Sequence, residues 1–229
     1  MSSHAFPRAS DALRIRVRRL RSAALALALC GLACSSTPLE PWHSERLESE
    51  FDAGMADEVR SFDDYLRLED RLFEELDAEV YAQVATGPEH ELFRYSAGSA
   101  ADPRNGDPDW NRSFELPPDA AAAAGGVLLL HGMSDSPYSL RALAQLLNRR
   151  GYRVVGLRLP GHGTAPSGLV HVRARDMVAA TRLAMEHLAS ALPGKPLHIV
   201  GYSTGASLAL GHALDAMEGA VAPVPASLV

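Results

Sequence analysis

This chain has only two cysteines and lacks the sequence motifs typical of metal sites and nucleotide-binding sites. Its only cysteines are Cys30 and Cys34, so the part after them can form no internal disulfide. No cluster of His, Cys, Asp or Glu has metal-ligand spacing, and the sequence contains neither a Gly-x-Gly-x-x-Gly run nor a phosphate-binding loop. We therefore expect no metal and no cofactor.

The apolar run near the N-terminus is too short to cross a bilayer stably. An arginine-rich stretch at residues 14–21 precedes the Ala/Leu run 23–29, which is the pattern of a secretory signal peptide, and we place that signal at residues 1–33. Cys34 follows Gly-Leu-Ala and precedes two serines, as in bacterial lipoprotein signals. This predicts a lipidated Cys34 and a membrane-anchored protein of the bacterial cell envelope. Because Gly31 stands where leucine is usual, a plain cleaved signal with an incidental cysteine is the alternative.

Charge is unevenly distributed along the chain. The formal net charge is −6, yet residues 45–79 alone carry 14 acidic and four basic side chains. A nucleic-acid partner is not expected, because a phosphate-binding surface would need the opposite sign.

The acidic segment has the pattern of an amphipathic helix. Ser61, with Asp64 three residues later, resembles a capping box, and the Gly-Pro pair at 87–88 would end the helix. We expect its apolar stripe to lie on the rest of the protein and its charges to face solvent; a surface for a cationic partner is the alternative. With a proline-containing tether at 35–44, it makes up a tether and acidic helical segment at residues 34–89. Its apolar residues at helical spacing are Phe62, Leu66, Phe73, Leu76 and Val80.

Further along, strand patterns alternate with helix patterns. Apolar runs at 127–130, 152–157 and 197–200 are typical of buried parallel strands. The fold class is then α/β, a mostly parallel sheet with helices on both faces. The helical patterns run from Ser136 and Pro137 to Gly151, and from about 174 to 192.

The most specific motif is Gly-Tyr-Ser-Thr-Gly at residues 201–205. It follows a strand pattern and precedes a helix-forming run, which is the strand–turn–helix context of a nucleophile elbow. Such a turn holds Ser203 at strained backbone angles, and the flanking glycines avoid collisions in the tight reversal. Two further motifs precede it: His-Gly-Met at 131–133 and Pro-Gly-His-Gly at 160–163.

In their order and spacing, these three motifs resemble the α/β-hydrolase superfamily. The resemblance is to the branch of monoacylglycerol lipases, bacterial carboxylesterases and serine aminopeptidases, and it covers residues 90–229 as the N-terminal portion of such a domain. It implies that Ser203 is the nucleophile and that the backbone N–H groups of Met133 and Thr204 form the oxyanion hole. It also implies a small-molecule ester or amide substrate.

Two histidines of these motifs and two neighbouring segments also give expectations. His131 is expected to be a hydrogen-bonded structural residue, and His162 to pack its own loop, with lining of the crevice as the alternative. The short runs 92–95 and 112–116 resemble the antiparallel hairpin with which superfamily members often open. The alanine-rich stretch 120–126 is expected to be a connector.

The sequence departs from the family after Ser203. The triad of this fold runs Ser, then Asp or Glu, then His along the chain, and only His212, Asp215 and Glu218 follow Ser203 as candidates. His212 lies nine residues into the expected helix, about 13 Å along it, so we expect all three to be ordinary helix surface. Residues 226–229 look like the opening of a further strand. We therefore expect the triad Asp and His beyond residue 229, and the 229-residue chain alone to be inactive.

Three functions remain open. The first is a serine hydrolase that cleaves a carboxylic, acylglycerol-like ester through an acyl-enzyme at Ser203. The second is a peptidase or amidase of the serine aminopeptidase-like branch, and the third is a catalytically inactive, truncated hydrolase-like lipoprotein. The oligomeric state is open.

Overall fold

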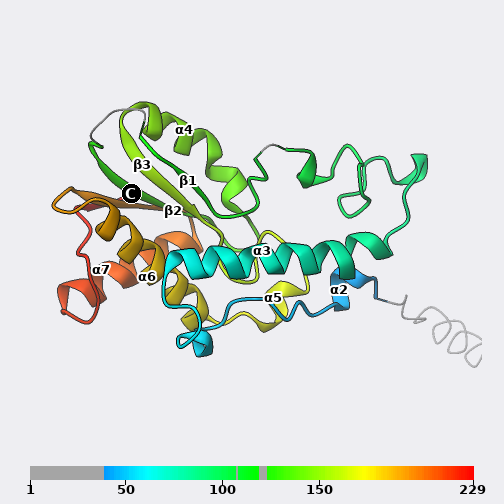
Figure 1. Cartoon of the computed structure of the whole chain (residues 1–229), viewed down its shortest axis with the longest axis horizontal. Helices are drawn as coiled ribbons and strands as arrows, with labels where there is room; N and C mark the ends of the chain where they lie inside the picture. The colour runs from blue at the N-terminus through cyan, green and yellow to red at the C-terminus, as the bar shows by residue number, and fades with distance from the viewer. Residues whose placement is uncertain (1–38, 107, 119–122) are drawn as a thin grey trace, which may run out of the picture. The chain divides into compact units, whose positions relative to one another are not determined.

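In the computed structural model, which describes residues 39–106, 108–118 and 123–229, five strands form one sheet (Figure 1). The strand order is β1-β3-β2-β4-β5, with β2 parallel to both β3 and β4, β5 parallel to β4, and β1 antiparallel to β3. The three predicted parallel strands are thereby confirmed, and the run at 226–229 does contain a further parallel strand. The strands are β1 (Phe114–Leu116), β2 (Gly125–Leu130), β3 (Tyr152–Leu157), β4 (Leu197–Gly201) and β5 (Ser227–Leu228).

Helices cover both faces of the sheet, as the sequence predicts. All six residues of the central strand β2 are buried, and successive side chains point to opposite faces. Val127 and Leu129 pack with α4, whereas Leu128 and Leu130 belong to the cluster that contains the buried residues of α6 and α7. The described helices are α2 (Pro41–Ser44), α3 (Phe62–Glu79), α4 (Arg141–Arg149), α5 (Gly168–His171), α6 (Ala174–Ala191) and α7 (Thr204–Met217), with short 3-10 turns η1 (Ala53–Met55), η2 (Tyr81–Gln83), η3 (Pro88–His90), η4 (Pro103–Asn105) and η5 (Pro137–Leu140).

The acidic helix α3 begins as predicted but ends early. The capping box is complete, because the Ser61 side chain accepts from the Asp64 N–H and the Asp64 side chain accepts from the Ser61 N–H. The helix stops at Glu79 rather than at the Gly-Pro pair 87–88. Val80 and Tyr81 leave the helical path for a 3-10 turn, where both side chains are buried. The helix ends early because these two side chains are buried against other parts of the protein, which the local sequence pattern does not indicate.

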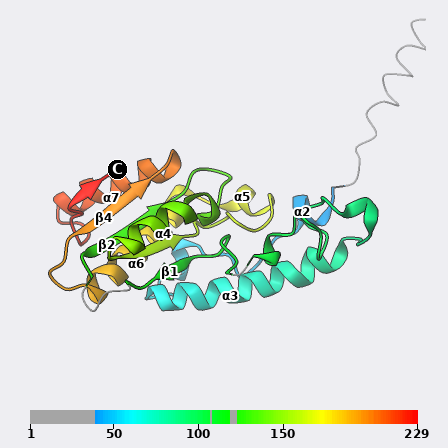
Figure 2. The ribbon, with the colours of Figure 1, turned by 90° about the horizontal axis from the view of Figure 1, so that it is seen from above.

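Helix α3 has two halves with different neighbours. Its first half contributes Phe62, Tyr65 and Leu68 to the core cluster that includes Leu128 and Leu130 of the sheet. Its second half contributes Leu72 and Leu76 to another cluster, which also contains Tyr81 and Tyr95. Trp42 packs against this second cluster. Figures 1 and 2 show α3 running past the end of the sheet toward α2. The apolar stripe therefore lies on the protein, as expected.

The predicted hairpin is wrong in its first half. Of the two short runs, 112–116 contains strand β1, but 92–95 forms turns, with Leu92 82% exposed. The N–H groups of Phe93 and Ser96 bond to the carbonyls of the residues three positions earlier, so they are not available to a strand ladder.

The N-terminal predictions fall largely outside the described residues. The signal peptide 1–33 and Cys34 lie there, as do residues 120–122 of the expected connector. The connector prediction is wrong for its last two residues, because Gly125 and Gly126 pair with neighbouring strands as the start of β2. Among the helices that the structure does describe, none is both long and apolar enough to cross a membrane.

Candidate active site

The turn between β4 and α7 holds Ser203 in a strained conformation. Its φ of 52° and ψ of −112° are values that a residue with a side chain rarely adopts. The glycines on either side are sterically required: a Cβ on Gly201 would lie 2.4 Å from the carbonyl oxygen of Gly205, and a Cβ on Gly205 would lie 2.2 Å from that of Leu130. The Ser203 residue itself is exposed. The local geometry is that of an accessible hydroxyl on a sharp strand-to-helix turn.

The loop after β2 lies directly against this turn. The N–H of Tyr202 donates to the carbonyl of Leu130 at 3.0 Å, and a Cβ on Gly132 would stand 3.5 Å from the Cβ of Ser203. Met133, the next residue, is 52% exposed, and Thr204 is the first residue of α7. Within the described part of the chain, no acceptor takes the N–H of either Met133 or Thr204. Two backbone donors, one of them at the positive end of a helix, are therefore available beside the serine.

His131 is a buried structural residue, as expected. Its Nδ1 lies 2.8 Å from the carbonyl oxygen of Gly132, and its Nε2 accepts from the N–H of Leu159 at 3.0 Å. Because a carbonyl can only accept, the proton of the neutral ring sits on Nδ1. Burial lowers the pKa of His131 to about 4, so the ring is neutral at neutral pH.

His162 packs its own loop and also borders a cavity. Its Nδ1 is 2.8 Å from the carbonyl oxygen of Pro160, and burial lowers the pKa of the ring. The cavity, of about 880 Å³, is formed by the loops after β2 and β3 and by residues from 94 to 106. Ser134, one residue after Met133, is among the residues that line this cavity. Its volume is large enough for a small molecule.

The three residues proposed as helix surface behave differently from one another. Glu218 is exposed and Asp215 half-buried, but His212 is buried, and its Nε2 lies 3.1 Å from the carbonyl oxygen of Pro223. The surface prediction is therefore wrong for His212, because the chain that leads to β5 returns across that side of α7. In the described residues, no imidazole hydrogen-bonds to Ser203.

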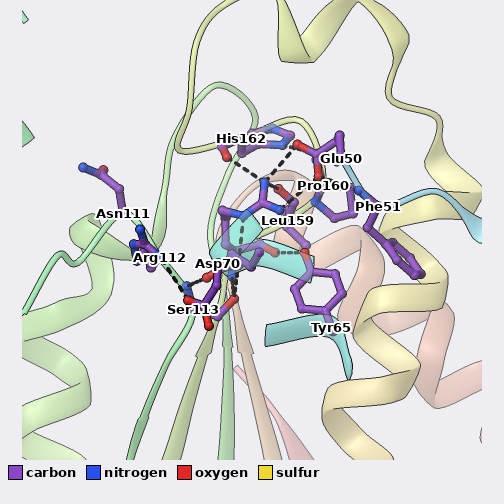
Figure 3. Close-up of polar contacts among 12 residues, drawn as sticks. Glu50, Phe51, Tyr65, Asp70, Asn111, Arg112, Ser113, Leu159, Pro160 and His162 are labelled. Atoms are coloured by element: carbon purple, nitrogen blue, oxygen red, sulfur yellow. Dashed lines mark hydrogen bonds and ion pairs between the residues drawn. The ribbon is translucent and has the colours of Figure 1, made fainter. Parts of the chain in front are cut away.

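Sequence reasoning missed a buried ionic cluster at the end of β3, and Figure 3 shows Glu50, Tyr65, Ser113 and His162 around it. Arg158, directly after β3, has a side chain only 1% exposed and pairs with Glu50 at 3.0 Å and with Glu69 at 2.9 Å. Glu69 lies on α3, so the expectation that the charges of that helix face solvent is wrong at this position. The available signal was an arginine placed between a buried strand and the Pro-Gly-His-Gly loop. Its two carboxylate partners lie 108 and 89 residues away, so no local pattern indicates them.

No metal site emerges from the part of the chain that the structure covers. Its His, Cys, Asp and Glu side chains form no group of three or more that could hold an ion.

Comparisons with known proteins agree with the motifs. The family model described as serine aminopeptidase, S33, matches residues 121–227. A thermostable monoacylglycerol lipase from Bacillus sp. (strain H-257) is 34% identical over 85 residues, which cover 37% of this chain and 33% of the lipase. The magnesium-chelatase 30 kDa subunit of Rhodobacter capsulatus is 35% identical over 113 residues, which cover 48% of this chain and 38% of the subunit. The chain thus spans about a third of the length of these curated relatives.

Solved structures of lipolytic enzymes are also similar to it. One, from work on the metagenome-derived lipolytic enzymes LipS and LipT, is 32% identical, with 48% of this chain and 42% of that chain covered and a TM-score of 0.43. A thermostable carboxyl esterase from Bacillus coagulans is 19% identical, with 51% and 37% covered and a TM-score of 0.41. The family match and the lipase agree with the resemblance drawn from the three motifs: residues 121–227, a little under half of the chain, are similar to the family described as serine aminopeptidase, S33.

Proposed function

We propose that this protein is a serine hydrolase that cleaves a carboxylic ester, of the acylglycerol type, through an acyl-enzyme at Ser203. The observation that carries the proposal is the strained, exposed Ser203 next to two backbone N–H groups that no described residue engages. The identity to a monoacylglycerol lipase supports an ester as the substrate.

The chemistry follows from these positions. The Ser203 Oγ attacks the ester carbonyl carbon, and the carbonyl oxygen becomes an oxyanion that accepts from the N–H groups of Met133 and Thr204. The C–O bond to the alcohol then breaks, and water hydrolyses the acyl-serine to release the acid and restore Ser203. Acyl transfer also needs a base for the Ser203 proton. The expectation that an Asp and a His further along complete the triad stays a prediction.

Two alternatives compete with the ester reaction. The description of the matched family favours a peptidase or amidase, in which the leaving group is an amine instead of an alcohol. The other is a binding protein without turnover, in which the strained turn has no catalytic use. A panel of p-nitrophenyl esters against aminoacyl p-nitroanilides separates the first two, and absence of Ser203-dependent turnover on both would favour the third.

The nucleophile is tested with a fluorophosphonate probe on the full-length gene product. We expect covalent label at Ser203, and loss of both label and ester turnover in Ser203→Ala. Ser207→Ala is the matched control, because Ser207 is an exposed serine one helical turn further along α7. Label or turnover that survives in Ser203→Ala at wild-type level would refute the assignment.

We further propose that Cys34 carries a lipid that tethers the protein to a membrane of the bacterial envelope. The support is the basic, apolar signal pattern before Cys34. Metabolic labelling with a fatty-acid analogue should mark the wild type and Cys30→Ala but not Cys34→Ala. Label retained in Cys34→Ala would contradict the anchor.

A further inference from the structure

Every polar group of Arg158 has a partner. Its side chain donates to Glu69 through Nε at 2.9 Å, to Glu50 through Nη1 and Nη2 at 3.1 and 3.0 Å, and to the carbonyl of His162 at 3.0 Å. Its own N–H donates to the Ser113 hydroxyl at 2.9 Å, and its carbonyl accepts from the Tyr65 hydroxyl at 2.7 Å. The backbone at Arg158 is therefore held on both sides.

This fixed backbone is linked by two further hydrogen bonds to the loop beside Ser203. The N–H of Leu159, the next residue, donates to Nε2 of His131, and Nδ1–H of His131 donates to the carbonyl of Gly132 at 2.8 Å. The same carbonyl accepts a longer bond, of 3.3 Å, from the N–H of Asp135. The Gly132 carbonyl and the Met133 N–H belong to one planar peptide unit and point in opposite directions. Holding the carbonyl on the His131 side therefore aims the N–H of Met133 the other way.

The side chains that bond to Arg158 come from outside the three hydrolase-type motifs. Glu50 and Glu69 belong to the acidic segment, and Tyr65 lies on the same helix α3 as Glu69. Burial disfavours the charge on Arg158, but the neighbouring Glu50, Tyr65 and Glu69 outweigh it and raise the pKa of the guanidinium, which stays charged. The acidic segment is thus coupled, through one buried cation, to the orientation of a single peptide group.

We propose that Arg158 is a positioning residue for the oxyanion-hole N–H of Met133, and that docking of the acidic segment through Glu50 and Glu69 sets that position. The proposal rests on the proposed hydrolase function of Ser203. A role in stability alone is the competing explanation, because removing one partner of a buried ion pair is by itself destabilising.

A single and a double variant distinguish the positioning role from a role in stability alone. Arg158→Met leaves Glu69 buried without a cation, and adding Glu69→Gln removes that uncompensated charge while it keeps an acceptor oxygen for Ser113. Glu50, at 18% side-chain exposure, can still reach water. The double variant should regain stability but cannot donate to the His162 carbonyl. Glu115→Gln is the control: this carboxylate pairs with Arg153 and His187 in the same region of the protein and does not contact the loop after β2.

The primary measurement is hydrogen exchange of the peptide 131–136 in the full-length protein. We expect exchange there to rise by about tenfold in Arg158→Met and to stay high in the double variant, whereas Glu115→Gln matches wild type. With an ester substrate, kcat should fall by about 10²-fold in both Arg158 variants, with KM unchanged, because a displaced oxyanion donor acts in the transition state.

Recovery of both exchange protection and kcat in the double variant would overturn the proposal, since both would then follow stability alone. Wild-type exchange in Arg158→Met would overturn it as well. If no variant shows Ser203-dependent turnover, the proposed function fails; the exchange data still decide whether Arg158 orders the loop.

Discussion

The sheet region at 125–229 and the acidic segment at 45–79 are held in different ways. The central strand β2 is buried on both faces by apolar side chains, and its packing partners lie in the helices that directly follow each strand. The acidic segment packs an apolar stripe and adds buried charges that meet Arg158. The first mode follows from local periodicity, whereas the second depends on residues about a hundred positions apart.

Two neighbouring residues on α3 show the contrast most clearly. Glu69 is 3% exposed and accepts from Arg158, from the Ser113 N–H and from the Ser113 hydroxyl. Asp70 has a side chain 70% exposed and pairs with Arg112 at 3.0 Å on the surface. We therefore expect these two neighbouring carboxylates to contribute differently to the free energy of unfolding.

The largest effect should come from the single substitution Arg158→Met. It leaves the buried Glu69 carboxylate without its cation, and we expect a loss of about 3–5 kcal/mol in the free energy of unfolding. Urea denaturation measures it. A loss of under about 1 kcal/mol would show that apolar contacts alone hold the acidic segment.

The pH dependence of stability should report the buried His131. Its pKa in the folded protein is about 4, below the ordinary 6.5, so the unfolded chain binds more protons between these values. Stability should therefore be complete above pH 6.5 and fall by about 3 kcal/mol as the pH drops to 4. The comparison is with His131→Gln, which does not titrate. Parallel stability–pH curves for the two proteins would contradict the neutral, buried ring.

The turn at Ser203 should tolerate no side chain at its second glycine. Gly205→Ala places a Cβ 2.2 Å from the Leu130 carbonyl oxygen, and we expect a loss of about 1–3 kcal/mol. Gly211→Ala, in the same helix with nothing within 4 Å of the added Cβ, should gain about 0.5–1 kcal/mol instead. Thermal unfolding of the two variants should move in opposite directions, and similar shifts would show that the turn relaxes.

The smallest effect is expected at Asp70. Asp70→Ala removes an exposed ion pair with Arg112, so the free energy of unfolding should change by less than about 0.5 kcal/mol. Glu69→Ala in the same helix should cost several times more. Equal losses for the two variants would erase the distinction between the buried and the exposed charge.

Much of the sheet region could be predicted, and the failures have identifiable causes. The strands, helices α4 and α6, the capping box at Ser61 and the turn at Ser203 all depend on short-range patterns. The end of α3 at Glu79, the turns at 92–95 and the burial of His212 depend on which distant surface covers them. The residues next to these segments carry no pattern that predicts which distant part of the chain covers them.

The sequence by itself determined the parallel strands, their order along the chain and Ser203 at the strand-to-helix turn, because periodicity and glycine requirements act within a few residues. Only the tertiary structure decided that Arg158 is buried, that Glu69 rather than Asp70 joins it, and that His131 holds the Gly132 carbonyl. The physical reason is that a buried charge needs an opposite charge or a hydrogen-bonding group close to it in the folded protein. Folding supplies them from any point of the chain.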